Sequence, residues 1–566
     1  MKERSFFLSA ASSRLAASCL FPDDRLVQGA ILIAPPLVEE RKGAILPMVE
    51  AARRFVDELH VVVLRIDYSG TGDSQGAFET ARPLDWPREI ADASDWLMHF
   101  VPGVPLCWFA IRTGCPLVLQ ALDLAKKRPD ALLFWDAVSG RESLQQWLRR
   151  HMVNNMIAYG SAHVSRAELE KNLGEGGRTV DLDGFAFAAP VSAALQRAAL
   201  PTLAQSSEWP PLLSLASGHP SSDLKKALEG RSRVTEKQLH LPPYWNSVGY
   251  IDTVQLREAS LPWLKKCFQE TAAVSLAIPP SAFSMDGSGN ERMVAIPDHG
   301  RTIRGVLHNR SKKTAPDGRA VLFLGGWSGD RKGPHRLFVE FARDLALRGI
   351  PSLRIDYRGR GEGDGSAADG SIRKMVEDAS SAITWLHESG KAPKGVVLVA
   401  ICSGCKVAIT ASSEPAVNRL VLWSAETMGS LRSSSTNARK TFANLGVYFK
   451  KLFRAETWRK LARGEVNTNM VGKALVHHET RSASEAKDED RTLRTFRSFR
   501  GPLTFIYGSS DPNAPAAQAA YKRFCKRYGL KADFSVIPNA GHSYYGLDWT
   551  EELLKRTRVA LFRTCQ

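Results

Sequence analysis

Residues 396–411 read VVLVAICSGCKVAITA, and this stretch decides the fold of the second half of the chain. The β-branched apolar run at its start predicts a buried strand, and the spacing of apolar residues after it predicts a helix. The turn between them carries Cys402, with the small residues Ala400 two positions before it and Gly404 two positions after it. This is the pattern of a nucleophile elbow, in which small residues let strand and helix backbones approach each other. Cys402 is therefore the candidate nucleophile.

A cysteine at the start of a helix lies near unpaired backbone N–H groups, which favour its thiolate form. Two other interpretations remain open at this point. Cys402 is a buried structural cysteine in one of them, since most cysteines are of that kind. In the other, Cys402 and Cys405 form a C-x-x-C redox pair.

In folds with this elbow the acid and the base follow the nucleophile along the chain, each after a later strand. The segment GPLTFIYGSSDPN places Asp511 after an apolar strand, and FSVIPNAGHSYYG places His542 in a Gly-His turn after the next. We predict His542 as the general base and Asp511 as the acid that orients it. Glu426, after the strand-like segment RLVLW, is the alternative acid.

An acyl-transfer site also needs N–H donors for the developing oxyanion. The residue after the nucleophile, Ser403, supplies the first. The glycine-rich segment LFLGGWSGDRKG supplies the second, with Trp327 the preferred donor and Gly326 next to it. The same glycines are compatible with a simple turn. His335 and Arg336, further along, either line the substrate pocket or lie on the surface.

Three motifs occur twice in the chain, in the same order and register. ILIAPPLVEERKG from Ile31 returns as VLFLGGWSGDRKG from Val321, and RIDYSGTGDSQG from Arg65 returns as RIDYRGRGEGDG from Arg354. AIRTGC from Ala110 returns as AICSGC, and all three pairs are about 290 residues apart. The two halves are therefore copies of one fold.

The Pro-, Gly- and Ser-rich stretch AVSLAIPPSAFSMDGSGNE separates the copies and predicts domains over residues 1–281 and 282–566. Within each half, short apolar strands alternate with longer helical segments, which predicts a mostly parallel sheet covered by helices. We therefore expect two tandem α/β-hydrolase-fold domains, each with a helical lid insertion.

The first half lacks the residues for covalent catalysis. Its elbow carries Arg112 in place of a nucleophile, and neither an acid nor a Gly-His turn follows at the expected places. Arg112 either binds an anionic ligand or pairs structurally with Glu39, Glu40 or Asp136. We expect a binding, docking or scaffold role for this half.

The chain is basic, with a formal net charge of +17, which favours anionic partners or a membrane surface. No apolar run approaches the roughly 20 residues of a membrane span, and Arg14 interrupts the segment where a signal peptide needs an unbroken apolar core. We expect a cytoplasmic protein. Between Glu426 and Arg500 lies the expected lid, whose cations form either an anion site or a solvated face; they include Lys450, Lys451, Arg454, Arg459, Lys460, Arg494, Arg497 and Arg500.

These motifs resemble two bacterial α/β-hydrolase families of the exosortase and exopolysaccharide systems, fused end to end. PPLVEE, RIDYSGTGDSQG, an arginine elbow and FWDAVSGRESLQQWLR are similar to the exosortase A system-associated hydrolase 2. GGWSGDRKGPHRLFVEFARDLALRGIPSLRIDYRGRGEGDG, the cysteine elbow and ETWRKLARGEVN resemble hydrolase 1 of that system. Ala400 departs from the usual glycine. The resemblance implies a role near exopolysaccharide production, beside acyl-activating and carrier proteins, without fixing a substrate.

The predicted function is hydrolysis of an acyl ester or thioester through an acyl-enzyme on Cys402. One alternative is acyl transfer from a carrier-protein or CoA thioester to a sugar or other hydroxyl; another is a noncatalytic scaffold that docks carriers. We expect no cofactor, no metal and no nucleic-acid partner, and peripheral membrane contact stays open.

Overall fold

The structure is a computed structural model of the 566-residue chain. It describes all residues except 160–163, 175–178, 199, 201–208, 248, 270, 288, 312–317, 432–482 and 563–566. Among the described residues, no helix combines the length and the apolar character that crossing a bilayer requires.

The second half is built on a mixed sheet in which antiparallel strands precede a parallel array. Its strand order is β13-β14-β16-β15-β17-β18-β19-β20 within the part of the chain described. β15 pairs in parallel with both β16 and β17, so the chain starts near the middle of the parallel array and winds outward in both directions. The strands are β13 (Glu291–Asp298), β14 (Arg301–His308), β15 (Ala320–Leu324), β16 (Ser352–Ile355), β17 (Val396–Ile401), β18 (Val417–Trp423), β19 (Leu503–Gly508) and β20 (Ala532–Ile537).

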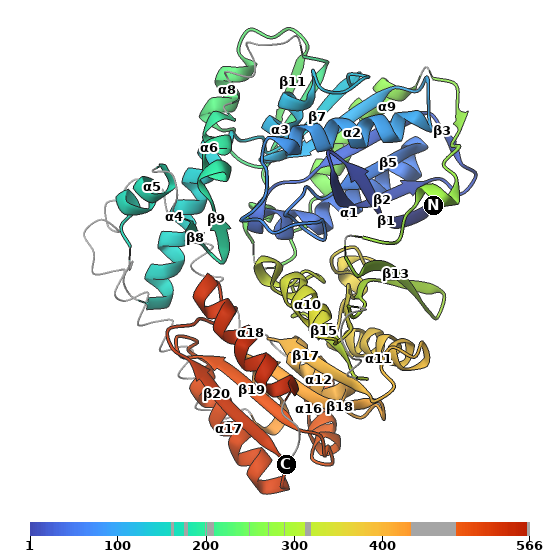
Figure 1. The fold of residues 1–566 in the computed structure, drawn as a ribbon. Coiled ribbons are helices and arrows are strands. Elements are labelled where there is room, and N and C mark those ends of the chain that lie inside the picture. The colour runs from blue at the N-terminus through green and yellow to red at the C-terminus, as the bar shows by residue number, and fades with distance from the viewer. Residues whose placement is uncertain are drawn as a thin grey trace.

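The first half repeats this topology. Its described sheet has the order β1-β2-β5-β4-β6-β7-β10-β11. When only the strands of each sheet are numbered along the chain, the two sheets have the same strand order. The sequence repeat therefore extends to the whole sheet (Figure 1). The strands are β1 (Lys2–Ala10), β2 (Ser13–Phe21), β4 (Gly29–Ala34), β5 (Val61–Ile66), β6 (Leu106–Ile111), β7 (Ala131–Trp135), β10 (Leu212–Ala216) and β11 (Val234–Gln238).

Helices cover both faces of each sheet, because the central strands are apolar on both faces. In β17, Leu398 packs with one helical layer and Val399 with the other. In the second half, α11 (Ile372–Glu388), α12 (Gly404–Ala411), α16 (Ala483–Phe496) and α17 (Ala514–Tyr528) form one layer, and α10 (Leu337–Leu347) and α18 (Leu547–Phe562) the other. In the first half, α2 (Asp85–His99) and α3 (Gly114–Ala121) lie opposite α1 (Val38–Leu59) and α9 (Val254–Phe268).

Each half has an insertion after its sixth strand in the sheet order. In the first half it comprises α4 (Gly140–Tyr159), α5 (Arg166–Gly174), the hairpin β8 (Val180–Leu182) and β9 (Phe185–Phe187), and α6 (Ala189–Arg197), before α8 (Ser222–Leu228). In the second half the corresponding insertion runs from β18 to α16. Residues 432–482 of that predicted lid, with Lys450, Lys451, Arg454, Arg459 and Lys460, lie outside the described residues.

The connection between the halves follows the first half before it enters the second. β12 (Val274–Ser275) pairs with β3 (Leu26–Val27), and Leu276 and Ile278 pack into the first core. Met285 then joins a small apolar cluster made by Phe7 and Ala16 of the first half with Met293 and Val306 of the second. The predicted boundary at residue 282 falls between β12 and β13.

The repeated RIDY segments meet at the interface between the halves. Asp73 accepts hydrogen bonds from Arg331 at 2.8 Å and from Arg354 at 2.7 Å. In the opposite direction, Arg65 lies 3.9 Å from Glu362. Asp73 and Glu362 hold matching places in the repeat, as do Arg65 and Arg354. The halves therefore pack in a pseudosymmetric way, each placing an arginine against the other's acid.

This ionic interface is buried. Arg331 and Asp73 are almost inaccessible to solvent, and Arg331 also binds Glu362 at 3.0 Å. Burial raises the pKa of Asp73 and of Glu362, but the cations around each carboxylate outweigh burial and hold both pKa values well below their usual range. Both carboxylates are therefore charged at neutral pH, and the repeated RIDY segments serve to join the halves.

Candidate active site

The elbow has the backbone strain that the sequence pattern requires. Cys402 adopts a left-handed conformation with φ of 57°, which costs on the order of 1 kcal/mol or more for a residue other than glycine. A Cβ on Gly404 would overlap the carbonyl oxygens of Leu324 and Gly325. Glycine at 404 therefore lets α12 approach β15, next to the turn between β17 and α12. Figure 1 shows these three elements in the second half.

The predicted base and acid meet beside this turn. The Nδ1 atom of His542 lies 2.7 Å from Oδ2 of Asp511, whose side chain is buried after β19. A potential ligand nitrogen of His542 also lies within 4.8 Å of the Cys402 Sγ atom. Three side chains from separate strand ends thus form the chain of contacts nucleophile, imidazole and carboxylate, in the order that general-base activation uses.

The groups around His542 favour the protonated form of its imidazole. Burial lowers the pKa of the imidazole, whereas the hydrogen bonds to Asp511 and Cys402, together with their negative charges, raise it to about 10. The imidazole is therefore a cation at neutral pH in this arrangement. A cation beside the sulfur stabilises a thiolate, which is the attacking form of cysteine.

The alternative acid, Glu426, also lies close to the nucleophile. Cys402, Glu426 and His542 each offer one potential ligand atom, and these three atoms lie within 4.8 Å of one another. Among the described residues, this is the one group with the spacing of a metal site. Glu426 lies 3.6 Å from the ammonium group of Lys406, whereas Nδ1 of His542 is bonded to Asp511. The absence of a resident metal stays a prediction.

The predicted oxyanion donors lie against the elbow. The backbone N–H of Trp327 donates to Oγ of Ser403 at 2.7 Å, and a Cβ on Gly326 would lie 3.6 Å from the Cys402 Sγ atom. Arg360 holds the next peptide group of this loop, because its Nε donates to the Trp327 carbonyl at 2.6 Å. A substrate oxyanion can use the Trp327 N–H only if the Ser403 hydroxyl turns away or shares it.

His335 and Arg336 lie between the halves rather than in the cleft beside His542. Arg336 donates to the carbonyl oxygens of Gly70 at 2.7 Å and Gly72 at 2.9 Å. His335 is buried against Gly184 of the first half, and burial lowers its pKa to about 4. The two residues therefore join the halves, and a substrate would have to displace these contacts to reach them.

Arg112 lies at the first-half elbow with its charge already neutralised. Its guanidinium donates to both carboxylate oxygens of Glu40, at 3.2 and 3.0 Å, and to Gln146 at 2.5 Å. The ring of Trp245 covers it at 4.4 Å. Of the two interpretations open from the sequence, this geometry matches structural pairing with Glu40. Arg112 also borders a cavity of about 260 Å³, which Trp245 helps to line.

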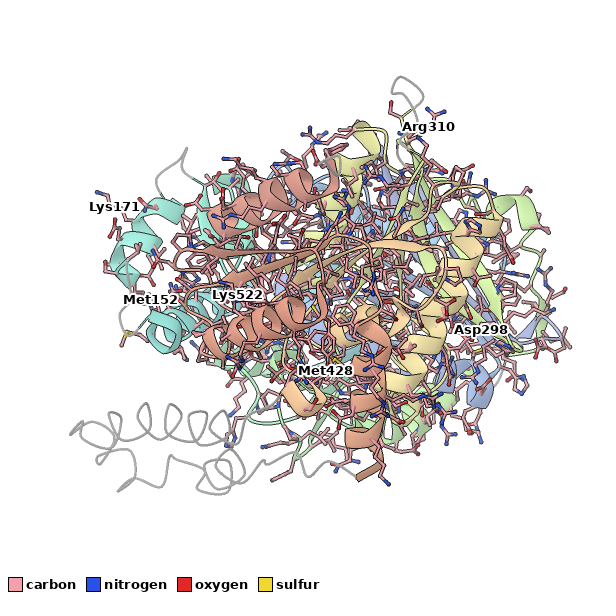
Figure 2. The ribbon with its side chains drawn as sticks, turned by 90° about the horizontal axis from the view of Figure 1, so that it is seen from below. Met152, Lys171, Asp298, Arg310, Met428 and Lys522 are labelled. Carbon is pink, nitrogen blue, oxygen red and sulfur yellow. The ribbon has the colours of Figure 1, made fainter. Side chains whose placement is uncertain are left out.

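His542 opens onto a cleft of about 880 Å³ shared by both halves. From the second half it is lined by Trp327, Arg360, His542 and Tyr545, and from the first half mainly by α1, α4 and residues 245–247 and 249–251. The start of α18 also contacts the first-half hairpin, where the Leu547 N–H donates to Asp181 at 2.8 Å. Figure 2 places Met152 of α4 at the edge of the molecule in the view from below.

Sequence reasoning missed two residues of this cleft, Arg360 and Arg149. Arg360 belongs to one of the repeated motifs. The difference between the two copies could have identified it, because the first half has Thr71 at the matching position. Arg149 follows from nothing local in the sequence, because α4 reaches the cleft only through the packing of the halves.

Three solved structures that are similar to this chain each cover about half of it. An esterase of Pyrococcus furiosus is 20% identical, with a TM-score of 0.34, over 48% of this chain and 90% of its own. A dienelactone hydrolase from Anabaena variabilis is 15% identical, with a TM-score of 0.30, over 47% of this chain and 94% of its own. Est1E from Butyrivibrio proteoclasticus, solved with ferulic acid, is 14% identical, with a TM-score of 0.33, over 48% of this chain and 100% of its own.

No curated protein sequence matches the chain. Residues 321–555 match the family described as the alpha/beta hydrolase family, and this range contains Cys402, Asp511 and His542. The second half of the chain has an α/β-hydrolase fold, and its similarity to this family covers residues 321–555.

Proposed function

We propose that the second half hydrolyses an acyl ester or thioester through an acyl-enzyme on Cys402. The observation that carries the proposal is the contact of His542 with Asp511 on one side and its proximity to the Cys402 sulfur on the other. A nucleophile, a base and an orienting acid in this order are the parts that covalent acyl transfer needs.

In the first step the Cys402 sulfur bonds to the substrate carbonyl carbon, and the carbonyl electron pair moves onto oxygen. The N–H groups of Ser403 and Trp327 stabilise that oxyanion. When the carbonyl re-forms, the bond to the leaving oxygen or sulfur breaks, and the imidazolium of His542 gives the leaving group its proton. A water molecule, deprotonated by neutral His542, then releases the acid from Cys402.

Transfer to another hydroxyl is a second candidate, supported by the size of the cleft. About 880 Å³ is room for a drug-sized molecule, and so for an acceptor beside the acyl group. The acceptor would replace water in the second step. Product analysis with and without an added sugar alcohol separates the two, because transfer yields an acylated sugar and hydrolysis yields free acid.

Selective alkylation tests the proposed nucleophile. Iodoacetamide at neutral pH should label Cys402 faster than Cys405, which is buried and whose pKa burial raises well above its usual value. Peptide mass spectrometry locates the label. Labelling of Cys402 no faster than that of Cys405 or Cys565 would favour the noncatalytic scaffold instead.

A role in exopolysaccharide production is part of the proposal and rests on the sequence resemblance alone. A strain that produces the Cys402→Ala protein in place of the native one tests this role. Altered acyl content or amount of secreted polysaccharide supports it, and an unchanged polymer contradicts it.

A further inference from the structure

We propose that the shared cleft binds an oxyanion group of the substrate, a phosphate or a carboxylate, between Arg360 of the second half and Arg149 of the first. This inference rests on the proposed function in one respect, because it names a chemical group carried by the molecule that Cys402 attacks. It gives the first half a part in substrate recognition although it has no nucleophile of its own.

Arg360 is a buried cation that has no counter-charge among the described residues. Its side chain donates to the carbonyl oxygens of Trp327, Gly359 and Ala367, and it packs against the Trp327 ring at 4.3 Å. No carboxylate among the described residues lies within ion-pair distance of it. The residue is only 7% exposed, and burial lowers its pKa. Keeping such a charge away from water is costly unless an anion meets it.

The fold itself does not require an arginine at this turn. The first half builds the matching turn with Thr71, whose hydroxyl donates to the Tyr68 carbonyl at 2.9 Å. The half that carries the nucleophile thus has an added cation at a place where the repeat manages with a neutral side chain. Arg360 also contacts the loop that carries Trp327, the predicted oxyanion donor. An anion bound at Arg360 is therefore close to the reacting carbonyl.

The other charges of the cleft leave a net positive surface. Its described carboxylates each have a cation already: Glu39 pairs with Lys42 at 3.1 Å, Asp183 with Arg150 at 3.2 Å, and Asp330 with Arg41 at 3.5 Å. Arg149 lines the same cleft from α4, is exposed, and forms no ion pair with a described residue. The charges left over are therefore those of Arg360 and Arg149.

The direct test measures binding without catalysis. The Cys402→Ala protein is titrated by calorimetry with coenzyme A, which carries phosphates, and with the succinyl thioester of N-acetylcysteamine, which carries a carboxylate. The neutral acetyl thioester of the same thiol is the reference. Binding of either anionic probe tighter than the neutral one supports the proposal, and the tighter probe identifies phosphate or carboxylate as the group recognised.

Variants then assign the binding to the two arginines. Arg149→Gln and Arg360→Gln should each lower the affinity for the anionic probe roughly tenfold, and the loss should be smaller at high salt. Arg360→Lys should retain part of the affinity, and Arg373→Gln, at an exposed ion pair on α11, is the matched control. Because Arg149 is exposed, its variant stays informative if Arg360→Gln unfolds.

Anionic probes that bind no better than the neutral thioester would overturn the proposal, as would equal affinities in Arg149→Gln and Arg373→Gln. These outcomes say nothing about turnover. Loss of the proposed function would appear separately, as failure of the native protein to acylate Cys402 with a neutral ester.

Discussion

Cys402 and Arg112 adopt the same left-handed conformation at matching turns of the two halves, with φ of 57° and 54°. Both turns are followed by a glycine, Gly404 or Gly114, on which a Cβ would overlap backbone carbonyl oxygens. The strained turn therefore persists in the first half without a nucleophile. Its geometry is a property of the fold, and only the side chain at the turn decides whether chemistry follows.

Replacement of the three proposed catalytic residues should separate their roles. We expect Cys402→Ala and His542→Ala to abolish ester turnover, and Asp511→Asn to slow it by roughly 10³–10⁴-fold because the imidazole loses its orienting partner. Steady-state rates of p-nitrophenyl ester hydrolysis measure this. Glu426→Gln is the matched control; if it is crippling while Asp511→Asn is harmless, Glu426 is the acid.

Removal of the Asp511 charge should also lower the pKa of His542 from about 10, since a carboxylate stabilises the imidazolium. The folded pKa lies above the usual value of about 6.5, so this group stabilises the fold fully below that pH and loses the contribution as pH rises through 10. NMR titration of labelled histidine follows the pKa. An unchanged His542 titration in Asp511→Asn would contradict the assigned contact.

Gly404→Ala should destabilise the second half by more than about 3 kcal/mol, because the new Cβ meets backbone carbonyls that cannot move without shifting β15. Urea unfolding measures the change. Gly218→Ala is the control, since a Cβ there meets no heavy atom within 4 Å. Equal stability of the two variants would show that the close approach of α12 and β15 is not required.

The ionic interface should be costly to break. Asp73→Asn leaves Arg331 and Arg354 buried with one carboxylate fewer, and we expect a loss of about 3–5 kcal/mol. Glu58→Gln, which breaks an exposed pair with Arg54, should cost at most about 1 kcal/mol. Because the pKa of Asp73 is depressed, its contribution persists from neutral pH downward and is lost only below about pH 4.

Arg112→Ala should act on stability rather than on chemistry. Its removal leaves Glu40 buried with the hydrogen bond from Trp147 but without the Arg112 cation, so we expect the melting temperature to fall. Hydrolysis of a small neutral ester, measured well below that temperature, should stay near the native rate. A large loss of turnover in the folded variant would show that the first-half elbow takes part in the reaction.

Much of this architecture is readable from the sequence, since the elbow around Cys402 and the strand-then-residue order of Asp511 and His542 are local patterns. The repeat at a constant spacing likewise predicts two copies of one sheet. The partners of Arg336 were not predictable, because its acceptors are backbone carbonyls more than 250 residues away, which leave no trace in side-chain identity.

The same limit explains the cleft. Arg149 and Arg360 come from different halves, and no sequence spacing states how two folded copies pack against each other. The sequence does show that Arg360 replaces Thr71 within an otherwise repeated motif. This difference can be interpreted only when the position of the neighbouring Trp327 loop is known.

The central claim is that Cys402 carries the acyl group, and trapping that intermediate tests it most directly. The native protein is mixed with p-nitrophenyl acetate, quenched in acid during turnover, digested and analysed by mass spectrometry. We predict one acetyl group on the peptide that contains Cys402, and none there in Cys402→Ala. Steady release of p-nitrophenol by the Cys402→Ala protein at the native rate, or an acetyl group that accumulates on another residue instead, would contradict the account.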